Sequence, residues 1–203
     1  MTYPIISADS HITEAPDTYL ANIDRAWRDK APRIVSTDKG DVFQIDGMAK
    51  PIHLGLVVAA GKPPESITTT GARFSDLHRG GWDPDARMAD QVRDGVAAEI
   101  IYPTVGMLLC NHPSYDYQKA CFDAYNRWIA AFCDRHPTRL LGCGQSAGRS
   151  PDEMIEDFKA IKALGLRGAI ALTLGSITPP AALLATIETG PGKDADCGGK
   201  YAR

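Results

Sequence analysis

An acidic residue and a histidine stand two positions apart where an apolar run ends, in the stretch ISADSHITEAP. The run Tyr3–Ala8 is typical of a buried strand, and Asp9 and His11 follow it. Side chains at i and i+2 of a strand point to the same face, so we expect the carboxylate and the imidazole together at its carboxyl end. Both groups are ligands of Zn²⁺-like cations. The alternative is that Asp9 caps a turn and His11 is an ordinary loop histidine.

Four further side chains are candidates for a pocket around this pair. Glu14 could contact His11, or it could be a solvated side chain that opens the first helix. Tyr102 and Thr104 end a later apolar strand and are expected as pocket walls. His112 lies in the loop after that strand and could touch a substrate, although a solvent-facing loop histidine is the more common case.

The elements that must position these residues alternate along the chain. Strands are predicted over residues 3–8, 97–102, 139–144 and 167–172. Helices are predicted over residues 16–30, 84–94, 114–135 and 151–164. Such alternation indicates parallel strands joined by crossovers. Only four strands are readable, whereas an eight-stranded barrel needs about 250 residues.

Local signals mark the ends of two helices. Asp83 is predicted to cap the second helix, with Val92 on its apolar face and Gly95 at its end. Ser150 is predicted to cap the last helix, with Glu153 completing a capping box. These residues therefore fix where the two helices begin.

A different pattern occupies the long segment between the first two strands. Residues 33–46 predict a β-hairpin, with Gly40 in its turn. Residues 50–81 are rich in Gly, Pro and Thr and predict an irregular excursion. We therefore expect an insertion that does not continue the strand–helix alternation.

Composition excludes several classes of protein. The 203 residues are 44% hydrophobic and 23% charged, with a net charge of −3, which indicates an ordinary globular protein and no nucleic-acid partner. No apolar stretch suits a membrane helix or a signal peptide, so we expect no membrane association and a cytoplasmic location. The five cysteines match no zinc pattern and are expected to be reduced, mostly buried thiols.

Four segments together carry a resemblance to a known family: ISADSHITEAP, GWDPDARMADQVRDGVAAEIIYPT, YNRWIAAFCDRHPTRLLGCG and DFKAIKALGLRGAI. The chain resembles the amidohydrolase-related branch of the metal-dependent amidohydrolase superfamily, which includes enzymes similar to aminocarboxymuconate semialdehyde decarboxylase. The resemblance implies a TIM-type barrel with a metal at the carboxyl ends of its strands. In that family the end of the first strand carries a metal-binding motif, and Asp9 and His11 occupy its two ligand positions.

The implied activity is that of a metal-dependent hydrolase or decarboxylase acting on a small carboxylated or cyclic substrate. A divalent metal is implied as the cofactor, with zinc as the expected ion. The family also uses a metal-binding His after a middle strand and an Asp after the last strand. Neither can be assigned in this sequence, so the catalytic residues are unknown.

The fold class expected is therefore α/β: a partial TIM-type (β/α) barrel, about the first half, with a β-hairpin insertion and an irregular C-terminal tail. Residues 1–173 are expected to form the N-terminal part of the barrel domain, and residues 174–203 the tail. A premature stop, a reading-frame change near Gly175 or a gene-model error would each explain the tail. The alternative is a catalytically inactive half-barrel that only associates with another chain, or with itself, through open barrel edges.

Overall fold

The computed structural model describes residues 3–57 and 59–171. The chain divides into two units, Met1–Leu172 and Thr173–Arg203, and the described residues all belong to the first. The expected irregular tail lies outside the described residues.

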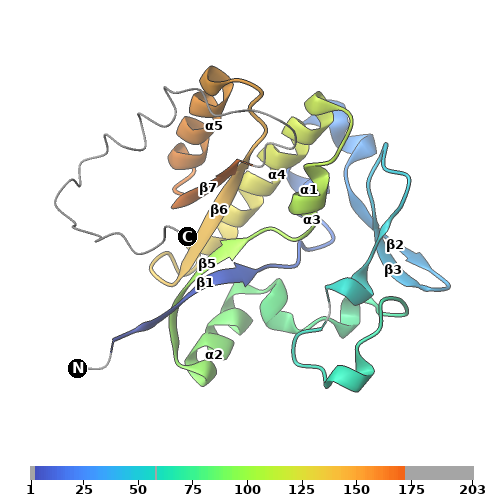
Figure 1. Cartoon of the computed structure of the whole chain (residues 1–203), viewed down its shortest axis with the longest axis vertical. Coiled ribbons are helices and arrows are strands. Elements are labelled where there is room, and N and C mark those ends of the chain that lie inside the picture. The colour runs from blue at the N-terminus through green and yellow to red at the C-terminus, as the bar shows by residue number, and fades with distance from the viewer. Residues whose placement is uncertain (1–2, 58, 172–203) are drawn as a thin grey trace, which may run out of the picture. The chain divides into compact units, whose positions relative to one another are not determined.

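The central element is a sheet of four parallel strands in the order β1-β5-β6-β7 (Figure 1). The strands are β1 (Ile5–His11), β5 (Val96–Tyr102), β6 (Leu140–Ser146) and β7 (Gly168–Ala171). The order across this sheet follows the order along the chain and never reverses, as in a (β/α) barrel and unlike a doubly wound sheet. The expected α/β class with a partial TIM-type barrel is confirmed.

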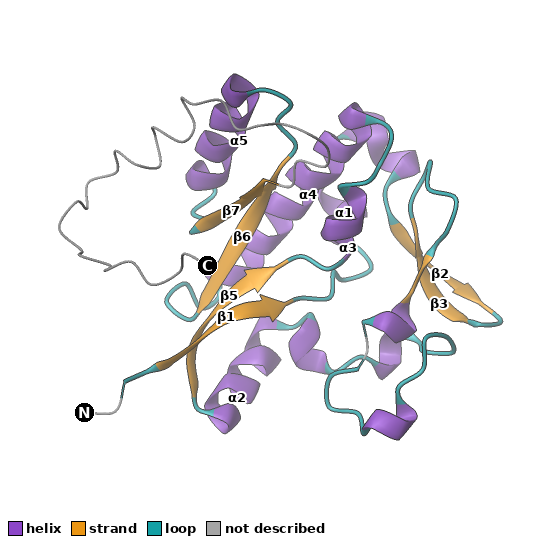
Figure 2. Cartoon of the chain, viewed as in Figure 1, coloured by secondary structure: helices purple, strands orange, loops and turns teal. Residues whose placement is uncertain are grey.

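Helices join the strands and pack on the sheet (Figure 2). They are α2 (Pro84–Asp94), which precedes β5, α4 (Tyr115–Asp134), between β5 and β6, and α5 (Pro151–Ala163), between β6 and β7. Two glycines of β6 permit close approach of these helices. A Cβ on Gly142 would lie 2.9 Å from the Sγ of Cys133, and one on Gly144 would lie 2.8 Å from the Cγ1 of Ile161.

One face of α4 forms much of the core. Its buried members are Cys121, Phe122, Tyr125, Ile129 and Phe132. Burial raises the pKa of the Cys121 thiol to about 12, which leaves that thiol protonated and unreactive at neutral pH. Cys110, Cys121, Cys133 and Cys143 are free, and Cys197 lies outside the described residues.

The predicted hairpin is present in a separate antiparallel sheet. This sheet contains β2 (Arg33–Thr37), β3 (Gly40–Gln44) and β4 (Ile52–His53). Gly40 pairs with Thr37, so Asp38 and Lys39 form the turn, and Gly40 itself begins β3 with a φ of 101°. The strand β4 was not predicted because two residues are too short to show a pattern. The segment after β4 contains short 3₁₀ helices: η2 (Leu54–Leu56), η3 (Pro64–Ser66), η4 (Phe74–Asp76) and η5 (Arg79–Gly81).

Two predictions about the N-terminal elements were wrong in part, and one later helix was missed. The strand β1 extends to His11, and it lies at the edge of the sheet formed by the described residues, with Ile5 61% and Ile6 55% exposed, whereas a buried strand was predicted. The predicted first helix is two short pieces, α1 (Thr18–Asn22) and the 3₁₀ helix η1 (Arg25–Lys30), because the chain becomes extended at Ile23. The helix α3 (Val105–Leu109) was not predicted.

The helix caps were mostly correct, but the buried face of α2 was not. Asp83 accepts hydrogen bonds from two backbone N–H groups of α2, as predicted. Val92 is 70% exposed, whereas Arg87 and Gln91 are the buried residues of this helix. In α5, Ser150 accepts from the backbone N–H of Glu153, as predicted for the N-cap. The side chain of Glu153 accepts from the N–H of Arg149 and not from that of Ser150, so the predicted capping box is not completed.

None of the helices in the described part of the chain combines the length and apolar character that crossing a membrane requires.

Candidate functional site

The side chains of Asp9 and His11 lie together at the carboxyl end of β1. The Nε2 atom of His11 is 3.5 Å from the Oδ1 atom of Asp9. The Nδ1 atom of His11 is 2.9 Å from the carbonyl oxygen of Pro103, just beyond the end of β5. Because a carbonyl can only accept, Nδ1 carries the proton of the neutral ring, and the lone pair belongs to Nε2, on the side of Asp9.

This arrangement fits a divalent cation. Two ligand atoms that each lie about 2.1 Å from a tetrahedral ion are about 3.4 Å apart, close to the Nε2–Oδ1 distance. Metal-binding histidines commonly donate their other ring N–H to a carbonyl or carboxylate, as His11 does to Pro103. Within residues 3–57 and 59–171, no group of three or more His, Cys, Asp or Glu side chains is placed to hold a metal. The pair Asp9–His11 therefore offers two protein ligands.

A β-bulge places Asp9. In the pairing of β1 with β5, Ser7 lies opposite Glu99 and Ser10 lies opposite Ile101. Three residue steps on β1 thus correspond to two on β5, so β1 contains one extra residue within 7–10, the segment that holds Asp9. Bulges commonly redirect a side chain beside a site.

Polar side chains from three elements hold this bulge from the helix side of the sheet. The hydroxyl of Ser10 donates to the Oε1 atom of Glu99 at 3.3 Å and lies 2.7 Å from the hydroxyl of Ser7. The Oε2 atom of Glu99 accepts from Arg87 Nε at 2.5 Å and from Gln91 Nε2 at 2.9 Å.

Arg87 also binds the backbone on both sides of the site. Its Nη1 atom donates to the carbonyl oxygens of His11 and Gly80, both at 3.1 Å. The backbone N–H of Thr13 donates to the carbonyl of Gly81 at 2.8 Å. The end of β1 and the helix η5 are thereby joined.

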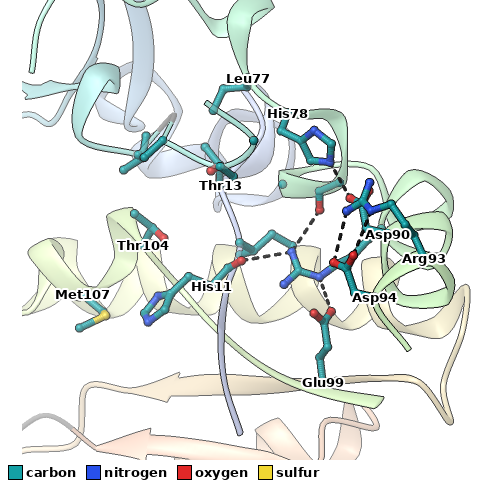
Figure 3. A pocket seen from close by; sticks show the side chains of 18 of the residues that line it. His11, Thr13, Leu77, His78, Asp90, Arg93, Asp94, Glu99, Thr104 and Met107 are labelled. Atoms are coloured by element: carbon teal, nitrogen blue, oxygen red, sulfur yellow. Dashed lines mark hydrogen bonds and ion pairs between the residues drawn. The ribbon is translucent and has the colours of Figure 1, made fainter. Parts of the chain in front are cut away.

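A cavity of about 870 Å³ opens at this end of the sheet (Figure 3). His11 and the predicted wall residue Thr104 line it, together with Met107 of α3. On another part of the wall, the Nε2 atom of His78 is 2.6 Å from the Oδ2 atom of Asp90. Both imidazoles therefore face one cavity.

Glu14 lies elsewhere than expected. It is completely buried and accepts hydrogen bonds from the backbone N–H groups of Thr104, Val105 and Gly106, at 3.0–3.1 Å. Burial raises the pKa of Glu14, and the three N–H groups act in the opposite direction. Glu14 thus anchors the start of α3 and does not line the cavity.

The other two candidates also lie outside the lining of the cavity. Tyr102 pairs with His11 across the strands, with ring centroids 5.9 Å apart. The Nε2 atom of His112 donates to the carbonyl of Asp46 at 2.7 Å, and its Nδ1 atom accepts from the N–H of Ser114 at 3.1 Å. The structure thus gives His112 a role in joining two loops.

Sequence reasoning missed Arg87 and Glu99. The signal was present: Glu99 interrupts the apolar strand AAEIIY, and a carboxylate in such a strand requires a partner. The partner, Arg87, lies on the buried face of α2, where an apolar residue was expected.

Comparisons with known proteins support the fold. No family model and no curated protein matches the chain. An amidohydrolase from Mycobacterium avium subsp. paratuberculosis K-10 matches with a TM-score of 0.60 and 19% identity, over 84% of this chain and 50% of that one. A 2,6-dihydroxybenzoate decarboxylase complexed with 2,6-dihydroxybenzoate matches with a TM-score of 0.50 and 14% identity, over 86% of this chain and 41% of that one.

A third structure is 5-carboxyvanillate decarboxylase from Novosphingobium aromaticivorans DSM 12444, complexed with manganese. Its TM-score is 0.48 and its identity 22%, over 82% of this chain and 41% of that one, and this likeness is too weak to support an argument. The resemblance seen in the sequence is confirmed at the level of the fold. The chain has the fold of the amidohydrolase barrels and spans about half the length of the first of these structures.

Proposed function

We propose that this chain is the N-terminal part of a metal-dependent hydrolase or decarboxylase of the amidohydrolase superfamily. Its substrate would be a small carboxylated or cyclic molecule, and residues 1–173 would form its part of the barrel. The observation that carries the proposal is the orientation of His11, whose Nδ1–H is engaged by Pro103 while Nε2 faces Asp9. The cavity beside this pair has room for a small molecule.

Asp9 and His11 would hold the divalent cation, with zinc and manganese as the ions to test. A bound cation supplies a polarising charge and lowers the pKa of a bound water. Thr104 and Met107 would form the wall that positions the substrate. His78, oriented by Asp90, would accept or donate a proton at its Nδ1 atom.

The test is turnover by the full 203-residue chain loaded with Zn²⁺ or Mn²⁺. Decarboxylation of 2,6-dihydroxybenzoate breaks one carbon–carboxylate bond, releases CO₂ and places a proton on the ring carbon, giving resorcinol. Hydrolysis is tested separately with a five-membered lactone, which water opens to a hydroxy acid. We expect turnover of one probe class by the wild type, and none by His11→Ala or after treatment with a chelator. Loaded wild type that converts neither probe would contradict activity of this chain, and a wild type that binds neither metal would contradict the proposed function as a whole.

One observation favours the second candidate, a half-barrel that associates with another copy or chain. Ile5 and Ile6 are exposed on β1, which pairs only with β5 among the described residues. Exposed apolar side chains on a sheet edge favour association. Light scattering after size exclusion should then show oligomers that Ile5→Ser/Ile6→Ser weakens. Val92→Ser, which removes an exposed apolar residue from α2, is the matched control and should change nothing. A wild type that is monomeric would exclude self-association.

A further inference from the structure

We propose that Arg87 and Glu99 are positioning residues, which hold the bulge of β1 so that Asp9 stands beside His11. This inference rests on the proposed metal pair. The two side chains form no hydrogen bond with the side-chain atoms of Asp9 or His11. They act on the backbone and on the two serines that flank Asp9.

The first step concerns the direction of the serines. In a regular strand, residues three apart point to opposite faces. Ser7 and Ser10 are three apart, yet their hydroxyls are 2.7 Å from each other. The bulge turns both to the same face, which requires a polar partner there because Ser10 is buried.

Glu99 is that partner. Its Oε1 atom accepts from Ser10, so the hydrogen of the Ser10 hydroxyl is committed and Ser7 must donate to Ser10. Its Oε2 atom accepts from Arg87 and Gln91. Each polar contact therefore has a defined direction, and a slip of β1 by one residue would break the contacts of Ser7 and Ser10.

Arg87 fixes the other end of the bulge. Its Nη1 atom holds the carbonyl of His11, while its Nε atom binds Glu99. One guanidinium thus joins the residue after the bulge to the carboxylate beneath it. The fork of Arg, with fixed spacing between its N–H groups, suits this role better than the single ammonium of Lys.

Stability alone is a weak reason for such a buried pair. The side chains of Arg87 and Glu99 are only 10% and 14% exposed. Replacing a buried ion pair by apolar residues of similar size is often neutral or stabilising. A buried polar group can instead select one register among several, and here the selected register is the one with Asp9 at His11.

The test uses the double variant Arg87→Met/Glu99→Leu of the full chain. Circular dichroism and a thermal melt report its folding, and equilibrium dialysis reports the affinity for Zn²⁺ and for Mn²⁺. The absorption spectrum of bound Co²⁺ reports the geometry of the ligands. We expect a folded protein whose metal affinity falls about 10-fold to 100-fold, as for loss of outer contacts at metal sites, and whose Co²⁺ spectrum changes.

The control is Lys119→Met/Asp123→Leu, which removes the ion pairs of Lys119 with Asp123 of α4 and with Asp157 of α5 and leaves the hydrogen bonds of Ser7 and Ser10 in place. Its affinity and its Co²⁺ spectrum should equal those of the wild type. A double variant at 87 and 99 that binds metal as the wild type does would overturn the inference. If that variant does not fold, Glu99→Gln is measured instead, with the same criteria.

Failure of the proposed function is recognised separately, by a wild type that binds neither metal. Amide hydrogen exchange of the metal-free proteins then decides the inference about positioning. Exchange in residues 7–13 should be at least about tenfold faster in the Arg87/Glu99 variant, with exchange in β6 unchanged. Equal exchange rates in residues 7–13 of the wild type and the Arg87/Glu99 variant would overturn the inference about positioning.

Discussion

The Nδ1 atom of His11 lies 2.9 Å from the carbonyl oxygen of Pro103, and this contact crosses from the end of β1 to the end of β5. It fixes both the ring orientation and the position of the proton. The lone pair at Nε2 is consequently directed towards Asp9. Because β5 lies next to β1 in the sheet, the carbonyl of Pro103 is in position to orient the His11 ring of the proposed metal pair.

The tautomer of His11 is directly measurable. Long-range ¹H–¹⁵N spectra of the neutral ring should show the proton of His11 on Nδ1. His136 provides the internal control, because its Nε2 atom lies 2.8 Å from a carboxylate oxygen of Asp85 and should carry the proton. Protonation of His11 at Nε2 would contradict the proposed ligand atom.

Glu14 should be important for stability. Glu14→Ala leaves three backbone N–H groups near the start of α3 without their acceptor, and we expect the unfolding free energy to fall by about 3 kcal/mol. The exposed Glu65 is the control, and Glu65→Ala should change this energy by less than about 0.5 kcal/mol. Urea denaturation measures both, and equal values for the two variants would disprove the anchoring role.

The pH dependence of stability follows from the raised pKa of Glu14. Burial moves this pKa above 4.5, so the native protein binds the proton more tightly than the unfolded chain does. The contribution of Glu14 is therefore fully present below pH 4.5 and is lost as the pH rises through the native pKa. The unfolding free energy of the wild type, relative to the non-titrating Glu14→Gln, should fall as the pH is raised to 7. The opposite slope would show that the three N–H groups outweigh burial.

Asp83 should determine the start of α2, the helix that carries Arg87. Asp83→Ala removes the acceptor of two backbone N–H groups and should lower the unfolding free energy by about 1–2 kcal/mol. Asp83→Asn keeps a side-chain acceptor and should retain most of this energy. Thermal melts of the two variants check this, and equal losses would show that charge, and not capping, is responsible.

Sequence alone predicted the elements whose signals are local. The cap at Asp83, the helix at 114–135 and the hairpin at 33–46 each depend on residues close together in the chain. The pairing of Asp9 with His11 was also foreseen from their spacing, although the structure adds a bulge that the spacing does not reveal.

The features that sequence reasoning missed depend on contacts between distant residues. Glu99 meets Arg87 across twelve positions, and Glu14 meets Gly106 across 92. The burial of Glu14 could not be foreseen because the backbone N–H groups that donate to its carboxylate lie at the start of α3, a five-residue helix without its own sequence signal. Similarly, Val92 was predicted on the buried face of α2 because it is apolar. The buried face instead carries Arg87 and Gln91, whose partner Glu99 lies on β5 and cannot be recognised from the helix sequence.

Metal binding by the intact chain tests the central claim most directly. Wild type, Asp9→Ala, His11→Ala and His136→Ala are dialysed against Zn²⁺ or Mn²⁺, and bound metal is measured by mass spectrometry. His136→Ala is the control because it removes another histidine that faces a carboxylate. We predict equal binding by the wild type and His136→Ala, and loss of binding in both Asp9→Ala and His11→Ala. Unchanged, stoichiometric metal in Asp9→Ala and His11→Ala would contradict the account.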